Sequence, residues 1–170
     1  SQISAPRAES LIDLMFSPIK YQNSELIIRQ STEMGVRCLF PTSFKRTINT
    51  KINLDKFNTY AVGAAQQSGR LSIPNIDKLI DLKDRSNIMS SKTVLMFDEN
   101  LKGVHLSQAK IKPNSEILVV IGPEGGFEEE ERAFISDNSK NFFNVSLGPN
   151  ILKADTAVIA ALSLTFHYFS

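Results

Sequence analysis

The stretch that most constrains the fold of this chain is Ile117–Phe127, which reads ILVVIGPEGGF. Its first five residues are apolar and mostly β-branched, and they predict a short buried strand. Gly122, Gly125 and Gly126 then predict a tight turn, because glycine reaches positive φ at little cost and has no Cβ to block a ligand. The carboxylates that follow suit the positively polarised first turn of a helix. Strand, glycine loop and helix in this order favour a small-molecule site at the carboxyl end of a sheet over an ordinary turn.

Strand-like and helix-like segments alternate along the rest of the chain. Strands are predicted at Ser10–Phe16, Val36–Phe40, Thr93–Phe97, Ile117–Ile121 and Phe142–Ser146. Helices are predicted from Asn23 or Ser24 to Met34, over Leu54–Gln67 behind an Asn53 cap, in a short segment within Pro74–Leu82, over Glu128–Ser136 and over Thr156–Phe166. This alternation predicts an α/β fold, with a mostly parallel sheet and helices on both faces.

Composition narrows the class of protein. The chain has 170 residues, 42% of them hydrophobic and 22% charged, as expected of one globular domain with a full core. The net charge of +1 gives no global nucleic-acid signature, but basic residues outnumber acids between Arg37 and Lys56, which suits either a phosphate backbone or a solvated face. The single cysteine, Cys38, excludes an intrachain disulfide and fits a reducing compartment. Without a long apolar run or a visible signal peptide, a cytoplasmic protein is expected.

A second informative stretch, Leu147–Ala157, reads LGPNILKADTA and lies between a predicted strand and the last predicted helix. Further motifs stand upstream of it: Glu33-Met34-Gly35-Val36, Pro41 followed by Lys45-Arg46, and Ala64–Arg70 followed by Pro74. In this order the motifs resemble those of the RsmE-type 16S ribosomal RNA uridine N3-methyltransferases, which belong to the SPOUT superfamily. The resemblance runs from about Lys20 to the C-terminus.

The resemblance implies a fold and a domain organisation. SPOUT domains thread their C-terminal segment through a loop and form a deep trefoil knot, so such a knot is expected here. Residues 20–170 would form the SPOUT methyltransferase domain, and residues 1–19 a short N-terminal segment that carries the first strand. The N-terminal, PUA-like RNA-binding domain of the family is absent from this sequence, so a truncated protein or a fragment of a longer one is expected.

The resemblance also implies S-adenosylmethionine as the cofactor, held in a bent shape by three loops. These loops correspond to Leu95–Glu99, Ile121–Gly126 and Leu147–Leu152. Their glycines let backbone groups approach an adenine edge and a ribose, and their apolar side chains supply the pocket walls. The residues expected to bind the cofactor are Leu95, Phe97, Glu99, Ile121, Gly122, Glu124, Gly125, Gly126, Leu147, Gly148, Ile151, Leu152 and Thr156. For Glu124, a structural role in orienting its loop is at least as well supported.

Methylation of uridine N3 requires the loss of a weakly acidic proton and an in-line attack on an electrophilic methyl group. The enzyme must also stabilise the negative charge that builds on the uracil carbonyls, or supply a base. Asn150, Lys153 and Asp155 are the candidate catalytic residues. Asn150 and Lys153 stand where the family usually has arginines, a departure that bears on catalytic rate and RNA affinity more than on fold or cofactor binding.

The expected partner is 16S ribosomal RNA or the small ribosomal subunit, with Arg46 and Arg70 as RNA contacts. A homodimer is also expected, because SPOUT domains complete their active site across a two-fold interface. The apolar segment Thr156–Phe169 supports it, since such a helix needs cover on more than one face. His105 and His167 lack a second ligand at metal spacing, so no metal site is expected.

Two other classes of function remain open from the sequence. The first is a catalytically impaired SPOUT-like module that binds RNA without transferring a methyl group, which the missing PUA-like domain and Asn150 favour. The second is a phosphate- or nucleotide-binding protein that uses the glycine loop as an anion site at a helix N-terminus. The lack of a Gly-Lys-Ser/Thr ending and the charge of Glu124 weigh against the second class.

Overall fold

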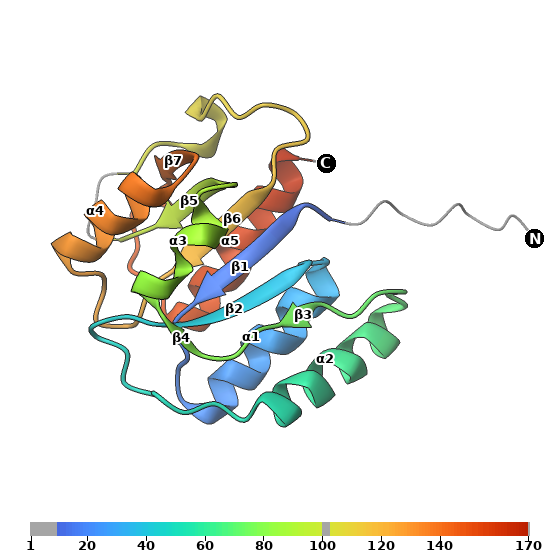
Figure 1. The fold of residues 1–170 in the computed structure, drawn as a ribbon. Helices are drawn as coiled ribbons and strands as arrows, with labels where there is room; N and C mark the ends of the chain where they lie inside the picture. Colours follow the sequence, from blue (N-terminus) through green and yellow to red (C-terminus); the bar gives the residue numbers. More distant parts are fainter. Residues whose placement is uncertain (1–9, 100–102, 170) are drawn as a thin grey trace, which may run out of the picture.

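A parallel β-sheet with helices on both faces forms the frame of the protein (Figure 1). The structure, a computed structural model, describes residues 10–99 and 103–169, so residues 1–9 of the predicted N-terminal segment 1–19 lie outside the described residues. The strands are β1 Ile12–Phe16, β2 Cys38–Ser43, β3 Asn75–Ile76, β4 Ile80–Asp81, β5 Thr93–Phe97, β6 Ile117–Ile121 and β7 Asn141–Asn144. The helices are α1 Tyr21–Met34, α2 Leu54–Ser68, α3 Ser86–Met89, α4 Glu129–Asn138 and α5 Ala154–Tyr168, with the 3₁₀ helices η1 Leu82–Arg85 and η2 Leu106–Gln108.

The strands follow the order β3-β2-β1-β6-β5-β7, with β4 paired to β2, and all these pairings are parallel. β1 lies at the centre, where Leu14 is in register with Leu39 of β2 and Val119 of β6. Because these strands run the same way, their carboxyl ends lie along one edge of the sheet and their amino ends along the other. The predicted α/β class with a mostly parallel sheet is confirmed.

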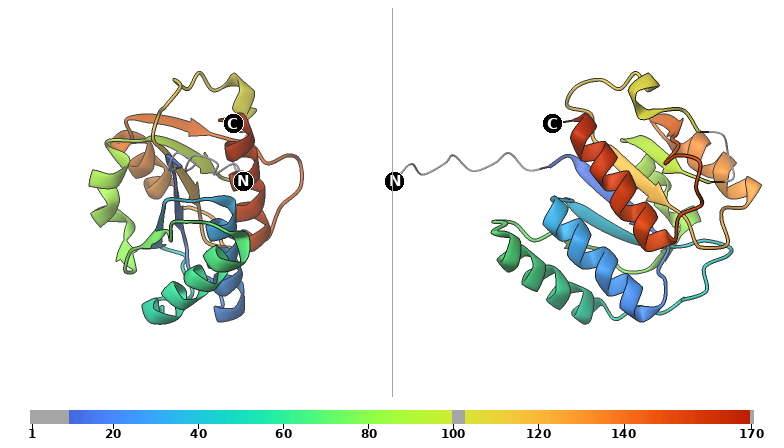
Figure 2. Two further views of the ribbon diagram at one scale, coloured as in Figure 1. Left: turned by 90° about the vertical axis from the view of Figure 1, so that its right-hand side faces the viewer. Right: turned by 180° about the vertical axis from the view of Figure 1, so that it is seen from behind.

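Alternating strand side chains divide the core between the two faces of the sheet. On one face Phe16 and Val119 pack with residues of α1, α2 and α5. On the other face Met15 and Val120 pack with residues of η1, α3 and α4. Figure 2 shows α5 and α1 side by side on the first face, with α2 beyond α1. The prediction that helices cover both faces is therefore confirmed.

Two helix boundaries follow directly from the residues at their ends. Asn53 caps α2 as predicted, because its side-chain oxygen accepts the backbone N–H of Lys56 at 3.0 Å. Gly35 ends α1 with φ of 101°, a left-handed conformation that costs glycine little. The start of α1 differs from the prediction, since the helix begins at Tyr21 rather than behind Asn23 or Ser24.

The reason for the early start of α1 lies in Ser24. Its hydroxyl does not cap the helix but bonds the backbone of Ile19, accepting the N–H at 3.1 Å and donating to the carbonyl at 2.8 Å. These bonds close a tight turn between β1 and α1. Lys20 occupies the N-cap position of α1 without a side-chain capping bond.

The short helix predicted within Pro74–Leu82 is wrong. β3 and β4 lie there instead and pair with β2, through Cys38 with Asn75 and through Thr42 with Ile80. Each strand is two residues long, too short for the alternation of apolar and polar residues that identifies a strand in a sequence. Helical turns follow only in η1 and α3.

The chain crosses back over the sheet between β7 and α5. β7 lies beside β5 and ends at Asn144, whereas α5 packs on α1 and β6. The crossing is close, because a Cβ on Gly103 would lie 2.5 Å from the backbone nitrogen of Ser146. Val104 and Val145 add an isolated parallel bridge at the same place. The trefoil knot expected for this region stays a prediction.

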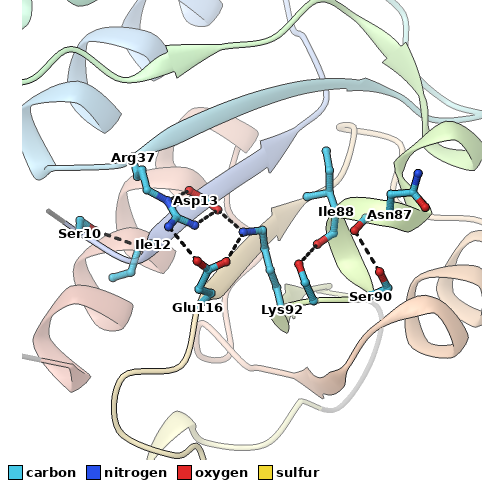
Figure 3. Close-up of polar contacts among 10 residues, drawn as sticks. Ser10, Ile12, Asp13, Arg37, Asn87, Ile88, Ser90, Lys92 and Glu116 are labelled. Carbon is cyan, nitrogen blue, oxygen red and sulfur yellow. Dashed lines mark hydrogen bonds and ion pairs between the residues drawn. The ribbon is translucent and has the colours of Figure 1, made fainter.

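Four charged side chains form a closed group at the amino edge of the sheet, here named the charge cluster: Asp13, Arg37, Lys92 and Glu116 (Figure 3). Asp13 is fully buried on β1 and accepts two hydrogen bonds from Arg37, at 2.9 and 2.8 Å. The ammonium group of Lys92 lies 2.8 Å from both Asp13 and Glu116, and Arg37 also reaches Glu116 at 3.0 Å. Hydrogen bonds from Arg37 and then Lys92 lower the pKa of Glu116 to about 2. Each charge of the cluster therefore has an opposite partner.

Candidate functional site

A cavity of about 540 Å³ opens at the carboxyl edge of the sheet. Four segments that follow neighbouring strands line it: the β1–α1 corner with Lys20, Phe97–Glu99 after β5, the glycine loop Ile121–Phe127 after β6, and residues of Val145–Ala157 after β7. Small-molecule sites occupy roughly 300–1,000 Å³, so the volume suits a ligand. The position is the one at which open α/β sheets bind ligands.

The glycine loop owes its shape to two positions where a side chain does not fit. A Cβ on Gly122 would lie 2.7 Å from the ring of Phe127, which is buried and packs edge-on against Phe44 with 5.4 Å between centroids. Gly126 has φ of 79° and donates its N–H to the carbonyl of Pro123 at 2.8 Å. The loop therefore turns sharply, and Gly122 and Gly126 bring its backbone to the cavity wall.

The loop after β2 holds the glycine loop and the start of α4 from outside the cavity. Glu131, almost fully buried, accepts the backbone N–H of Glu128 at 2.8 Å and that of Lys45 at 2.7 Å. Arg46 donates to the carboxylate of Glu128 at 2.9 Å and to the carbonyl of Gly125. A Cβ on Gly125 would meet the side chain of Arg46 at 3.1 Å, so Gly125 faces this contact rather than the cavity.

Two carboxylates reach the cavity from the end of β5. Asp98 is buried and accepts a hydrogen bond from Arg132 of α4, and this bond raises the pKa of Arg132. Partial burial of its carboxyl group raises the pKa of Glu99, and the negative charge of Asp98 raises it further. Asp98 is therefore committed to an ion pair, whereas Glu99 takes up a proton more readily than an ordinary glutamate.

The loop after β7 supplies the remaining wall. Gly148 has φ of 105° and donates its N–H to the hydroxyl of Ser146 at 3.1 Å, and a Cβ at Gly148 would stand in open space at the cavity wall. Ile151 is 80% exposed, an unusual state for a large apolar side chain. Asn150 and Lys153 line the cavity, and neither side chain has a hydrogen-bond or ion-pair partner among the described residues.

Most of the predicted cofactor and catalytic residues come together at this cavity. Those that line it are Phe97, Glu99, Ile121, Gly122, Glu124, Gly126, Leu147, Gly148, Asn150, Ile151, Leu152 and Lys153. They come from three separate loops that only the sheet order brings side by side. The apolar members lie next to exposed backbone, which is the mixture expected of a site for a nucleoside-like ligand.

Four predicted residues do not line the cavity. Leu95 is fully buried in the core on the α1 and α5 face of the sheet. Gly125 faces Arg46, as described above. Asp155 and Thr156 lie in the first turn of α5, which begins at Ala154, and the Asp155 carboxylate accepts the backbone N–H of Thr156 at 3.0 Å.

The two predicted RNA contacts lie at opposite edges of the sheet. Arg46 lies beside the glycine loop at the carboxyl edge and is 47% exposed. Arg70 follows α2 and donates to the carbonyl of Thr32 at 2.9 Å, near the end of α1. Because α1 ends where β2 begins, Arg70 belongs to the amino edge.

Asp98 and Pro123 line the cavity within the predicted loops, although they were not named individually. Sequence reasoning missed the rest of the lining: Lys20, Asn23, Phe127, Val145, Ser146, Ala154 and Ala157. For Lys20 and Asn23 a signal existed, since both follow a predicted strand and the carboxyl end of any parallel strand is a candidate site. The missing fact was that β1 lies next to β6, which a single sequence does not show.

Within the described residues, no group of three or more His, Cys, Asp or Glu side chains is arranged to hold a metal ion. Across residues 10–99 and 103–169, no helix combines the length and the apolar character that crossing a bilayer requires.

Comparisons with known proteins agree with the geometry. The family model for RNA methyltransferase domains matches residues 6–165. The ribosomal RNA small subunit methyltransferase E of Rickettsia conorii is 28% identical over 165 residues, which cover 95% of this chain and 66% of that protein. The chain thus spans slightly less than two thirds of the length of this relative.

Solved structures show the same likeness. The ribosomal RNA small subunit methyltransferase E from Neisseria gonorrhoeae, bound to S-adenosyl methionine, superposes with a TM-score of 0.84 at 26% identity and covers 93% of this chain and 66% of that one. A TrmH/SpoU tRNA modifying enzyme from Aquifex aeolicus has a TM-score of 0.60 at 15% identity, covering 95% of this chain and 76% of that one. The second likeness concerns the fold alone.

Proposed function

The chain belongs to the RNA methyltransferase domain family, and on that premise we propose that it transfers a methyl group from S-adenosylmethionine to N3 of a specific uridine in 16S ribosomal RNA. The Rickettsia relative is named as a methyltransferase of the small-subunit RNA, and the Neisseria structure holds S-adenosyl methionine. The uridine N3 target follows from the RsmE-type motifs of the sequence. Because the proposed substrate is ribosomal, a cytoplasmic location is part of the same proposal.

One observation carries the proposal: three loops from β5, β6 and β7 surround a single cavity of about 540 Å³ with the residue types the cofactor needs. Ile121, Leu147 and Leu152 offer apolar walls for the adenine ring. Gly122 and Gly148 line the cavity, where their backbone groups would face its polar edge and the ribose. When bound, the cofactor would supply an electrophilic methyl group.

The side chains at the cavity mouth suit the other half of the reaction. Uridine N3 becomes a nucleophile when it loses its proton, and the resulting charge spreads onto the two uracil carbonyls. Lys153 would stabilise that charge electrostatically, and the amide of Asn150 would donate a hydrogen bond to a carbonyl. Asp155 is a weaker candidate, because its carboxylate bonds the first turn of α5 and does not line the cavity.

Binding of the RNA would involve Arg46, whose guanidinium lies beside the cavity and is half exposed, and Arg70 at a greater distance. A homodimer remains part of the proposal. α5 buries Val158 and Leu162 against the sheet and leaves Ile159 half-exposed, so the helix has a face that a second copy would cover. Light scattering at micromolar concentration tests the proposed homodimer, and a measured mass equal to that of one chain would contradict it.

A second candidate is a SPOUT-like module that binds S-adenosylmethionine and RNA but transfers no methyl group. The observation in its favour is that Asn150 is uncharged at the cavity mouth, where the family usually has arginine. Such a module would retain both binding activities.

Two measurements separate the candidates. Calorimetry with S-adenosylmethionine, with ATP as the competitor ligand, establishes whether the cavity takes the cofactor. Transfer of a labelled methyl group to small ribosomal subunits that lack the modification then establishes the reaction, and mass spectrometry of the RNA locates the methyl group. Cofactor binding without transfer supports the impaired module, and binding of ATP alone contradicts both candidates.

A further inference from the structure

The β1–α1 corner contributes two side chains to the cavity that the three cofactor loops do not account for. They are Lys20, at the N-cap of α1, and Asn23, in its first turn. Neither belongs to the loops assigned to the cofactor. Their position raises the question of which part of the reaction they serve.

The order of the strands places this corner at one end of the cavity. Along the carboxyl edge the lining segments follow β1, β6, β5 and β7 in that order. With about 4.8 Å between neighbouring strands, this row is about 14 Å long. The cofactor loops follow the last three strands, so the corner extends the cavity past the glycine loop. The chain after β7 crosses back to α5, which packs on α1, so Lys153 at the N-cap of α5 borders the same cavity.

The side-chain polar groups of Lys20 and Asn23 have no partners within residues 10–99 and 103–169. Lys20 makes no capping bond to α1, and within the described residues its ammonium group has no ion pair. The amide of Asn23 likewise has no hydrogen-bond partner in that part of the chain. By contrast, the nearby cations Arg46 and Arg132 are held by Glu128 and by Asp98. Lys20 and Asn23 are therefore available to a ligand.

A second, smaller hollow of about 50 Å³ adjoins the cavity at this corner. Lys20, Pro123 and Glu124 line both, and the hollow also contacts Arg46 and Ile48, the latter 84% exposed. An exposed arginine beside an exposed apolar side chain suits contact with a nucleic-acid strand. Lys20 thus stands between the face where RNA would approach and the interior of the cavity.

From this placement we propose that Lys20 is a further catalytic residue of the methyl transfer and that Asn23 recognises the uracil, an inference that rests on the proposed function. The ammonium group of Lys20 donates a hydrogen bond to a uracil carbonyl while negative charge develops there. The N3–H bond breaks and its proton passes to solvent. The N3 lone pair forms the new bond to the methyl carbon, and the electron pair of the broken C–S bond stays on sulfur. Asn23 pairs with the imide edge of the base.

The test compares Lys20→Met with Lys20→Arg, and uses Lys83→Met as a matched control because Lys83 is an exposed lysine of η1 away from the cavity. Each variant is assayed for methyl transfer to unmodified small subunits at saturating subunit concentration, and for S-adenosylmethionine affinity by calorimetry. We expect Lys20→Met to lower kcat about 100-fold, the effect of removing one donor to a developing anion. We expect Lys20→Arg to recover part of the loss, Lys83→Met to match the parent, and all four proteins to bind the cofactor with similar affinity.

The pH profile separates a catalytic role from a structural one. In Lys20→Met the shortfall in kcat should shrink as pH rises, because uridine N3 then ionises without assistance. Asn23→Asp should lower kcat more than Asn23→Ala, since a carboxylate opposes the uracil anion.

Other outcomes overturn the inference in distinguishable ways. A raised KM with unchanged kcat means that Lys20 contacts a backbone phosphate, and lost cofactor affinity means that it binds the cofactor. If kcat and KM are both unchanged in Lys20→Met, Lys20 has no role in the reaction. If the parent chain binds S-adenosylmethionine but methylates no subunits, the proposed function fails and this inference falls with it.

Discussion

The charge cluster at the amino edge of the sheet and the mouth of the cavity at its carboxyl edge use polar side chains in opposite ways. At the amino edge the charge cluster pairs each charge with an opposite one at 2.8–3.0 Å. At the carboxyl edge Lys20, Asn150 and Lys153 border a cavity and have no partners among the described residues. Figure 3 shows the closed arrangement of the first edge.

The difference teaches how to separate structural charges from functional ones in this fold. Burying Asp13 is costly unless it stays fully paired, so the cluster supports the fold only as a complete group. The side chains of Lys20, Asn150 and Lys153 remain accessible to water and cost little in the free protein. They therefore gain partners only when a ligand arrives.

The largest expected effect comes from breaking the charge cluster at its centre. Asp13→Asn leaves Arg37 and Lys92 without the buried carboxylate, and we expect the free energy of unfolding to fall by about 3–5 kcal/mol. Urea denaturation measures it, and Glu25→Gln is the control, because its exposed pair with Arg29 is worth at most about 0.5 kcal/mol. Folded Asp13→Asn protein should bind S-adenosylmethionine normally, and a cofactor defect without loss of stability would contradict the division between the edges.

The next effect concerns the cavity wall. Gly148→Leu should weaken S-adenosylmethionine binding by about 100-fold or more, because the side chain would occupy ligand space at the wall. The positive φ of 105° adds a stability loss of about 1–2 kcal/mol. Gly125→Ala serves as the contrast, because its methyl group meets Arg46 outside the cavity and should leave affinity within several-fold. Equal affinity for Gly148→Leu and the parent would place the cofactor elsewhere.

The charge cluster also predicts a pH dependence. The pKa of Glu116 falls from its ordinary 4.5 to about 2 in the folded protein, so its stabilising effect is complete above pH 4.5 and disappears as pH falls from 4.5 towards 2. The parent should therefore exceed Glu116→Gln in Tm at pH 7, and the difference should shrink through that window. Because 41% of the Glu116 side chain is exposed, we expect the free energies of unfolding of the two proteins at pH 7 to differ by at most about 1 kcal/mol. A difference that grows on acidification would contradict the assignment.

The smallest expected effect tests the RNA contacts. Arg46→Ala should lower RNA affinity several-fold at low salt and reduce the slope of its salt dependence by about 1. Arg70→Ala should do less, because Arg70 already bonds the carbonyl of Thr32 at the other edge. Filter binding over a salt series measures both. If RNA affinity is unchanged when both arginines are replaced, the basic residues between Arg37 and Lys56 form a solvated face and do not contact RNA.

The parts of the fold that were predictable depend on local sequence. β6 is a continuous apolar run, and β5 is one after Thr93, so the pattern alone identifies them as buried strands. The two residues of β3 carry no such pattern and acquire their conformation only by pairing with β2. The sequence predicts Asn53 correctly as a helix cap, whereas the Ser24 side chain bonds the turn before its helix. Asn and Ser side chains can do either, and the sequence does not say which one a given residue does.

The same limit applies to the candidate site. Gly148 and Leu152 were identified through a motif, and both line the cavity. Lys20 and Asn23 lie in no motif of glycines or charges. They reach the cavity because β1 pairs with β6, two strands about a hundred residues apart in the chain, and that pairing comes from the packing of the whole sheet.

The order of the cavity walls along the chain has a consequence for biosynthesis. The residues of the charge cluster, 13 to 116, and the glycine loop emerge from the ribosome before Val145–Ala157, which supplies the last wall of the cavity. A growing chain can therefore assemble the centre of its sheet while it still lacks a place for the cofactor. Ligand binding stabilises only states that contain the site, so S-adenosylmethionine would protect the finished domain from proteolysis and leave its early intermediates unprotected.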